Sequence, residues 1–116
     1  MLRESCSANN IDVNLEAIID PRQSTGVPGG DELLAFANGV VGNDTEALDS
    51  AREKLASALG AEAVSAASLI VGNYSRNDRA ANAIGIPMEP MFLEMSEDFR
   101  ERLGINEFTS AANSLK

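Results

Sequence analysis

Apolar residues recur at intervals of three and four along most of the chain, which is the spacing of one face of an α-helix. The first such segment covers residues 3–19 and ends before Pro21. Its apolar stripe consists of Ile11, Leu15 and Ile18. Residues 20–30 then hold two prolines and three glycines. They predict a loop that runs over the surface.

The middle of the chain predicts three more helices, at residues 31–42, 44–59 and 61–84. The expected N-caps are Asp31 for the first and Asp44 or Thr45 for the second. The expected stops are Gly42, Gly60 and Gly85. The first two helices should form a hairpin. The third is the longest, and its first half, AEAVSAASLIVG, is apolar or small almost all round, which predicts burial on more than one side.

The C-terminal part predicts two short helices. Pro87 and Pro90 argue against a continuous helix in the segment IPMEPMFLEM. Ser96 is expected to cap a helix at 96–103, and Asn106 a helix at 106–115. The fold class is therefore all-α, a bundle of about six helices with a long central helix. We expect a single domain over residues 1–116, with its hairpin and long helix in residues 31–85 and its short helices in residues 96–115.

Composition removes several classes of function. The chain has 116 residues and no histidine, which excludes Ser-His-Asp and Cys-His catalysis and histidine-ligated metals. Its one cysteine, Cys6, allows neither an internal disulfide nor a four-ligand structural zinc site. The acidic group Asp44, Glu46 and Asp49 lacks the ligand spacing of a calcium loop. We expect no metal and no cofactor.

Charge and hydropathy restrict the partners and the location. The net charge of −9 disfavours nucleic acid, because phosphate-backbone binding needs an excess of Lys and Arg. The polar start MLRESCSANNIDV does not resemble a signal peptide. No apolar run approaches the ~18 residues that cross a bilayer. These features predict a cytoplasmic protein that binds neither nucleic acid nor membrane.

The order of the signals in the middle of the chain resembles a known family. The segments DELLAFANGVVGN, EALDSAREKLASALG and AEAVSAASLIVGNYSRNDRAANAIGIPME are similar to the C-terminal half of the carboxymuconolactone decarboxylase and alkylhydroperoxidase D-like superfamily. The resemblance covers residues 31–89 and is most specific at residues 73–87. It implies a small helical bundle that assembles as an oligomer.

The redox members of that family carry the motif C-x-x-C-x-x-x-H on a preceding helix. Aligning Cys6 with the second cysteine places Arg3 at the partner thiol and Asn10 at the histidine. The resemblance therefore implies that the family's intramolecular disulfide cycle cannot run in this chain. The decarboxylating members use a histidine, so that activity is not expected either.

Two groups of residues remain as candidate sites. Cys6 lies near a predicted helix N-terminus with Arg3 one turn away, and both features favour a thiolate. The alternative is that Cys6 is a small buried apolar residue. The second group occupies the end of the long helix and could bind a small anion through paired guanidinium groups. It consists of Asn73, Arg76, Asn77 and Arg79. Its alternative is structural, with arginines paired to Glu94, to Asp98 or across a subunit interface.

Three functions stay open on these grounds. The favoured one is a non-redox, oligomeric helical protein that serves binding or assembly. The second is a thiol-dependent protein of the peroxidase type that uses Cys6, and the third is a binder of small anions that uses Arg76 and Arg79. A homodimer is the favoured assembly, because the long helix presents apolar and small residues on more than one side.

Overall fold

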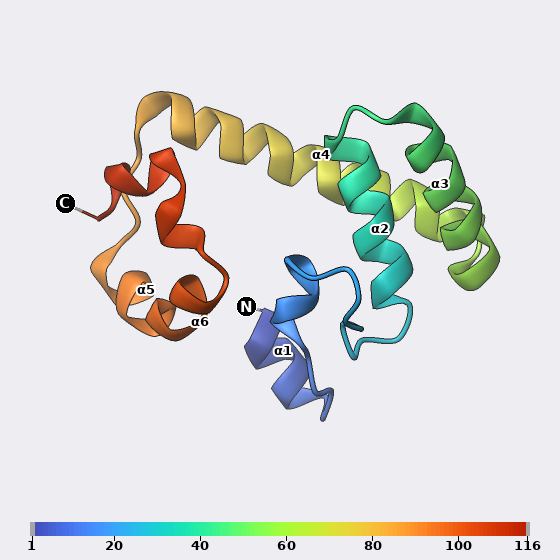
Figure 1. Cartoon of the computed structure of the whole chain (residues 1–116), viewed down its shortest axis with the longest axis horizontal. Coiled ribbons are helices and arrows are strands. Elements are labelled where there is room, and N and C mark those ends of the chain that lie inside the picture. The colour runs from blue at the N-terminus through green and yellow to red at the C-terminus, as the bar shows by residue number, and fades with distance from the viewer. Residues whose placement is uncertain (1, 116) are drawn as a thin grey trace. The chain divides into compact units, whose positions relative to one another are not determined.

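The computed structural model of the chain describes residues 2–115, with side chains from residue 5 onward. Over this range the protein consists of six α-helices and three 3₁₀-helices, and no strand occurs in it (Figure 1). The predicted all-α class is therefore confirmed. The chain divides into two compact units, residues 1–75 and 76–116, and the division falls inside the longest helix, α4 (Ala61–Ile84).

The first unit begins with two short helices where the sequence predicts one. Helix α1 (Leu2–Ala8) ends early, and a 3₁₀-helix, η1 (Leu15–Ile18), follows. Asn10 takes a left-handed conformation with a φ of 56°. The N–H of Ile11 then donates to the carbonyl of Cys6 at 2.8 Å, and the N–H of Asn10 donates to the carbonyl of Ser7 at 3.2 Å. This pair of bonds is a Schellman stop, which asparagine tolerates, so the predicted continuous helix at 3–19 is wrong.

The loop predicted at residues 20–30 is present, but its contact with the next helix differs from the expectation. Helix α2 (Gly30–Val41) has Gly29 at its N-cap position, and Asp31 is not the cap. The Asp31 carboxylate instead accepts hydrogen bonds from the backbone N–H of Thr25 at 2.7 Å and from its Oγ1 at 2.8 Å. Asp31 therefore fastens the loop to the start of α2.

Helices α2 and α3 (Thr45–Leu59) form the predicted hairpin, close to the predicted bounds. Asp44 is the N-cap of α3, and its side chain accepts from the N–H of Ala47 at 3.0 Å. Gly39 allows the two helices to approach closely, because a Cβ at this position would lie 3.1 Å from the Cα of Leu48.

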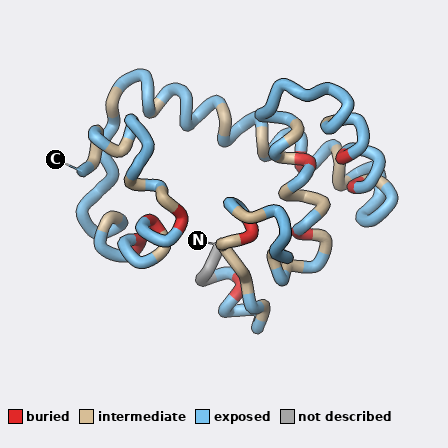
Figure 2. Tube along the Cα trace, viewed as in Figure 1, coloured by how far each residue is buried: buried red, intermediate tan, exposed pale blue. Residues whose placement is uncertain are grey.

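The core of the first unit is small and lies where α2, α3 and α4 meet (Figure 2). Its buried members are Phe36, Ala51, Leu55 and Ala67. Three partly buried residues pack against them, namely Leu33, Leu48 and Val64. The members from each helix lie three or four positions apart, as the predicted spacing requires, and α4 contributes only Val64 and Ala67.

Helix α4 has the predicted bounds and stops where the sequence indicates. Gly85 has a φ of 74°, a conformation that glycine adopts without steric cost. The N–H groups of Gly85 and Ile86 both donate to the carbonyl of Ala81, at 3.0 and 3.1 Å. Pro87 follows and cannot extend the helix.

The second unit continues with α5 (Pro90–Met95), α6 (Glu97–Arg102), η2 (Ile105–Glu107) and η3 (Thr109–Asn113). Helix α5 was not predicted from the sequence. Pro90 stands at its first position, where a missing N–H has no cost. Helix α6 lies within the predicted 96–103.

The α-helix predicted at 106–115 is wrong. Two 3₁₀-helices take its place, and between them Phe108 is extended, with a φ of −67° and a ψ of 140°. The segment NEFTSAANS is rich in Asn, Ser and Thr. The side chains of these residues compete with the backbone for hydrogen bonds and weaken α-helix.

Candidate binding sites

Cys6 is buried in α1, with 6% of its surface exposed. The side chain of Arg3 lies outside the described residues, so the cation expected beside the sulfur is not placed. Asn10, the residue aligned with the family's histidine, lies beyond the end of α1 and forms its left-handed stop. The motif-like pattern from Arg3 to Asn10 therefore does not continue on one helix, and the burial of Cys6 favours the structural interpretation of this residue.

The predicted anion-binding group lies on α4, and all four of its residues are exposed. Asn73 belongs to the first unit, whereas Arg76, Asn77 and Arg79 belong to the second. Within the second unit, Nη2 of Arg76 donates to Oδ1 of Asn77 at 3.4 Å. Exposed guanidinium groups are well solvated, so these positions offer a ligand little beyond a surface charge.

A different arginine is buried. Arg100 of α6 has 8% of its surface exposed. Its Nε donates to Oγ of Ser96 at 2.9 Å, its Nη1 to Oδ1 of Asn106 at 2.5 Å, and its Nη2 to the backbone carbonyl of Leu93 at 2.8 Å. We call these four residues the Arg100 clamp. The clamp ties α5 and η2 to α6, because its three acceptors lie before, at the start of and after that helix.

Ser96 extends the clamp by one bond. Its hydroxyl donates to the carbonyl of Phe92 at 2.5 Å while its oxygen accepts from Arg100. Ser96 occupies the expected N-cap position of α6, but its side chain makes no capping bond to that helix. Its burial, together with that of Arg100, makes this the most enclosed polar group of the second unit.

A cavity of about 190 Å³ lies against the clamp, and all of its lining residues belong to the second unit. Leu93, Ile105 and Phe108 contribute apolar walls. Four polar side chains also line it, those of Arg100, Asn106, Ser110 and Ser114. None of the lining residues is acidic, although the chain has 18 Asp and Glu residues.

A second cavity, of about 250 Å³, lies in the first unit between η1, the loop and α2. Its charged lining residue is Asp31, whose carboxylate already accepts both hydrogen bonds from Thr25. These bonds lower the pKa of Asp31 below its ordinary value, the backbone N–H of Thr25 contributing most. The polar group of this cavity is therefore engaged within the fold.

Arg100 was not among the residues predicted from the sequence to form a site. Its only local signal is the four-residue spacing from Ser96, which places the two side chains on one side of a helix. That spacing is common on exposed helices, and burial is what distinguishes this pair. The predicted sites, Cys6 and the α4 group, are not part of the clamp.

Two further findings concern metals and membranes. Among residues with described side chains, no three Cys, Asp or Glu groups are placed so that they could hold a metal ion. Within residues 2–115, no helix combines the length and the apolar character needed to cross a membrane.

Comparison of the sequence with family models, with curated proteins and with solved structures finds no match.

Proposed function

We propose that this protein acts by binding, as a self-associated helical protein, and that it is not an enzyme. The observation that carries the proposal is the exposure of large apolar side chains on α4 in the first unit. Ile70 is 58% exposed and Tyr74 is 55% exposed. Contiguous exposed apolar surface marks interaction sites more often than isolated exposed residues do.

The position of these side chains follows from helix geometry. Ala67 is buried and Val64 packs against the core, so they define the face of α4 that contacts the hairpin, and the half-buried Val71 lies one turn further along that face. Ile70 and Tyr74 each follow one of these residues by three positions, which places them at the edge of that face. The apolar surface therefore continues from the core onto the outside of the helix.

A second copy of this chain is the proposed partner. Among the described residues, the buried cluster where α2, α3 and α4 meet has four members, and two of them are alanines. Covering Ile70 and Tyr74 would enlarge that core. Close approach is sterically open nearby, because a Cβ at Gly72 would meet no atom within 4 Å. A twofold dimer is the commonest closed assembly, and we expect it to bury more than ~1,000 Å² in total.

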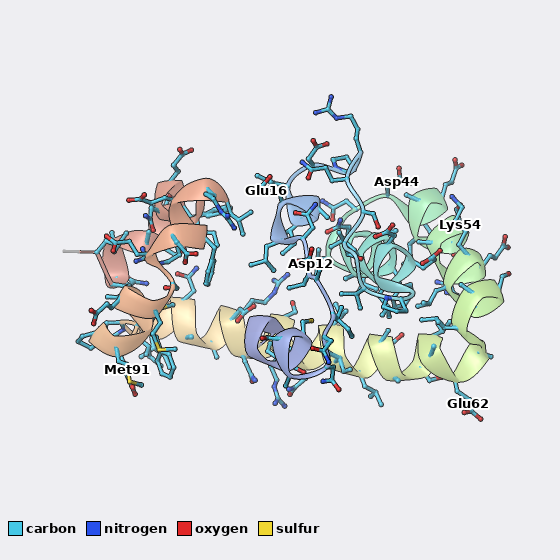
Figure 3. All side chains as sticks on the ribbon, turned by 90° about the horizontal axis from the view of Figure 1, so that it is seen from below. Asp12, Glu16, Asp44, Lys54, Glu62 and Met91 are labelled. Carbon is cyan, nitrogen blue, oxygen red and sulfur yellow. The ribbon has the colours of Figure 1, made fainter. Side chains whose placement is uncertain are left out.

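The second unit also presents apolar groups. Met91 projects outward from α5 (Figure 3), and 57% of its surface is exposed. Phe92 and Met95 on the same helix are exposed as well. Flexible methionine side chains adapt to varied apolar surfaces, so this helix supports binding as the function.

We also propose the relationship to the carboxymuconolactone decarboxylase and alkylhydroperoxidase D-like superfamily. It is supported by the α2–α3 hairpin followed by a long helix that ends at Gly85. The absence of histidine from the sequence and the burial of Cys6 support a non-redox member. A cytoplasmic location and independence from nucleic acid and membrane belong to the same proposal, in keeping with the net charge of −9.

The proposal is tested by comparing Ile70→Asp with Leu69→Asp. Leu69 is 76% exposed and lies about 200° around the helix axis from Ala67, on the opposite side of α4. Light scattering coupled to size exclusion should give a dimer mass for the wild type and for Leu69→Asp. Ile70→Asp should give a monomer with unchanged helical circular dichroism, because a buried charge opposes association. A monomeric wild type at ~50 µM, or equal masses for the two variants, would reject this assembly.

A further inference from the structure

The Arg100 clamp holds a positive charge, and none of its hydrogen-bond acceptors is a carboxylate. Arg100 is buried, and its three acceptors are a hydroxyl, an amide oxygen and a backbone carbonyl. No carboxylate of the described residues bonds to it, and none lines the adjoining cavity. Neutral acceptors satisfy the hydrogen bonds of a guanidinium, but in a poorly solvated place they stabilise its charge less than a carboxylate in contact does.

The polar side chains that line the cavity also have donors to spare. A guanidinium carries five N–H groups, and the clamp uses three of those of Arg100. Asn106 accepts through Oδ1, and its NH₂ group has no acceptor among the described residues. Ser114 accepts from the N–H of Met88 at 2.8 Å, and its hydroxyl hydrogen is likewise without an acceptor in residues 2–115. The lining side chains thus carry donors beyond those that the fold uses, and no lining residue offers them an anionic acceptor.

The size and walls of the cavity define what could accept these bonds. A volume of about 190 Å³ is slightly larger than the ~150 Å³ cavity that holds one benzene molecule. Leu93, Ile105 and Phe108 would contact an apolar body of that size. One cation with several neutral donors matches a single negative charge better than the double charge of a phosphate.

We propose that this cavity binds a small monocarboxylate with an apolar chain of about six carbon atoms. The carboxylate accepts from the remaining N–H groups of Arg100, with support from Asn106 and Ser114. The carbon chain lies against the apolar walls. The site lies entirely within the second unit and is independent of the dimer proposed through Ile70.

The clamp by itself does not require such a ligand, so the experiment must separate structure from binding. Hexanoate serves as the probe, hexanamide as its neutral analogue, and inorganic phosphate as an anion without an apolar chain. Binding is followed on the full-length ¹⁵N-labelled protein by the amide resonances of residues 88–115 and the Nε–H resonance of Arg100. Hexanoate should saturate with a dissociation constant of roughly 1 mM or lower. Hexanamide and phosphate should each bind at least ~10-fold more weakly.

Replacing Arg100 would break the clamp, so the variants are placed at the cavity wall. Ser110 lines the cavity and Thr109 does not, although both are exposed residues of η3. Ser110→Asp adds a carboxylate beside the donors and should weaken hexanoate binding at least ~10-fold. Thr109→Asp adds the same charge one residue away and should leave the affinity within ~2-fold of wild type.

Each contrary result overturns the proposal. Failure of hexanoate to saturate below ~20 mM would show that the cavity has no useful affinity for a monocarboxylate. Equal affinity for hexanoate and hexanamide would show that Arg100 does not recognise the charge. Equal losses in Ser110→Asp and Thr109→Asp would reduce the effect to general surface repulsion. In all three cases Arg100 would be a structural clamp only.

Discussion

Nε of Arg100 donates a 2.9 Å hydrogen bond to Oγ of Ser96, one helical turn earlier, and both residues are buried. Most arginine and serine side chains at this spacing are solvated and contribute little. Here both partners are buried in the smaller of the two units, so the stability of that unit should depend on the bond.

Replacing Ser96 with Ala removes the acceptor of Nε and leaves a buried donor unpaired. The cost should be about 1–3 kcal/mol in the free energy of unfolding of the second unit. Hydrogen exchange of the amides in residues 93–106 measures it. The matched control is Ser68→Ala, because Oγ of Ser68 donates to the carbonyl of Val64 at 2.7 Å on an exposed face of α4. The control should change stability by no more than about 0.5 kcal/mol. A similar small effect at Ser96 would show that the clamp contributes little.

The contact between Asp31 and Thr25 predicts a pH dependence in the first unit. The pKa of Asp31 is lowered below its ordinary value of 3.8, chiefly by the N–H of Thr25 and then by its hydroxyl. The folded state therefore binds the proton more weakly than the unfolded state does. The stabilisation from this contact is fully present above the unfolded pKa and is lost as the pH falls through the folded pKa.

The variant Asp31→Asn should accordingly melt at a lower temperature than wild type at pH 6, and the difference should shrink as the pH falls from about 4 towards 2. Thermal unfolding followed by circular dichroism across this range measures the effect. Asp78→Asn removes the same charge from an exposed position on α4 and should stay within about 0.5 kcal/mol of wild type at pH 6. A difference between Asp31→Asn and wild type that is constant with pH would contradict the prediction.

Cys6 should react slowly in the folded protein, because its side chain is buried in α1. A thiol reagent such as dithionitrobenzoate should label it at least ~10-fold more slowly in buffer than in 6 M guanidinium chloride. An introduced thiol at Ser5, an exposed neighbour on the same helix, provides the comparison in a Cys6→Ala background. Equal rates at residues 5 and 6 would reopen the alternative of a thiol-dependent protein.

Local signals in the sequence determined the middle of this protein. Helix α4 was predicted with its observed bounds, because its start after Gly60 and its stop at Gly85 depend on backbone conformations that glycine adopts easily. The cap of α3 was predicted to be Asp44 or Thr45, and it is Asp44, whose carboxylate accepts from the N–H of Ala47 without any residue outside that turn. The all-α class followed from the same periodicity.

Contacts between segments decided the rest. The end of α1 at Asn10 and the start of α2 at Gly30 lie where several hydrogen-bond partners are available to the same polar groups. Asp31, for example, accepts from Thr25 and does not cap its own helix. From the sequence alone, Arg100 is expected to be an exposed charged residue on a short helix. Its burial depends on α5 and η2, which precede and follow α6 in the chain. Leu93 of α5 and Asn106 of η2 both accept hydrogen bonds from its guanidinium. Such enclosure is a property of the packed unit, because desolvation of a charge is set by all the neighbours around it and not by the residues beside it in the chain.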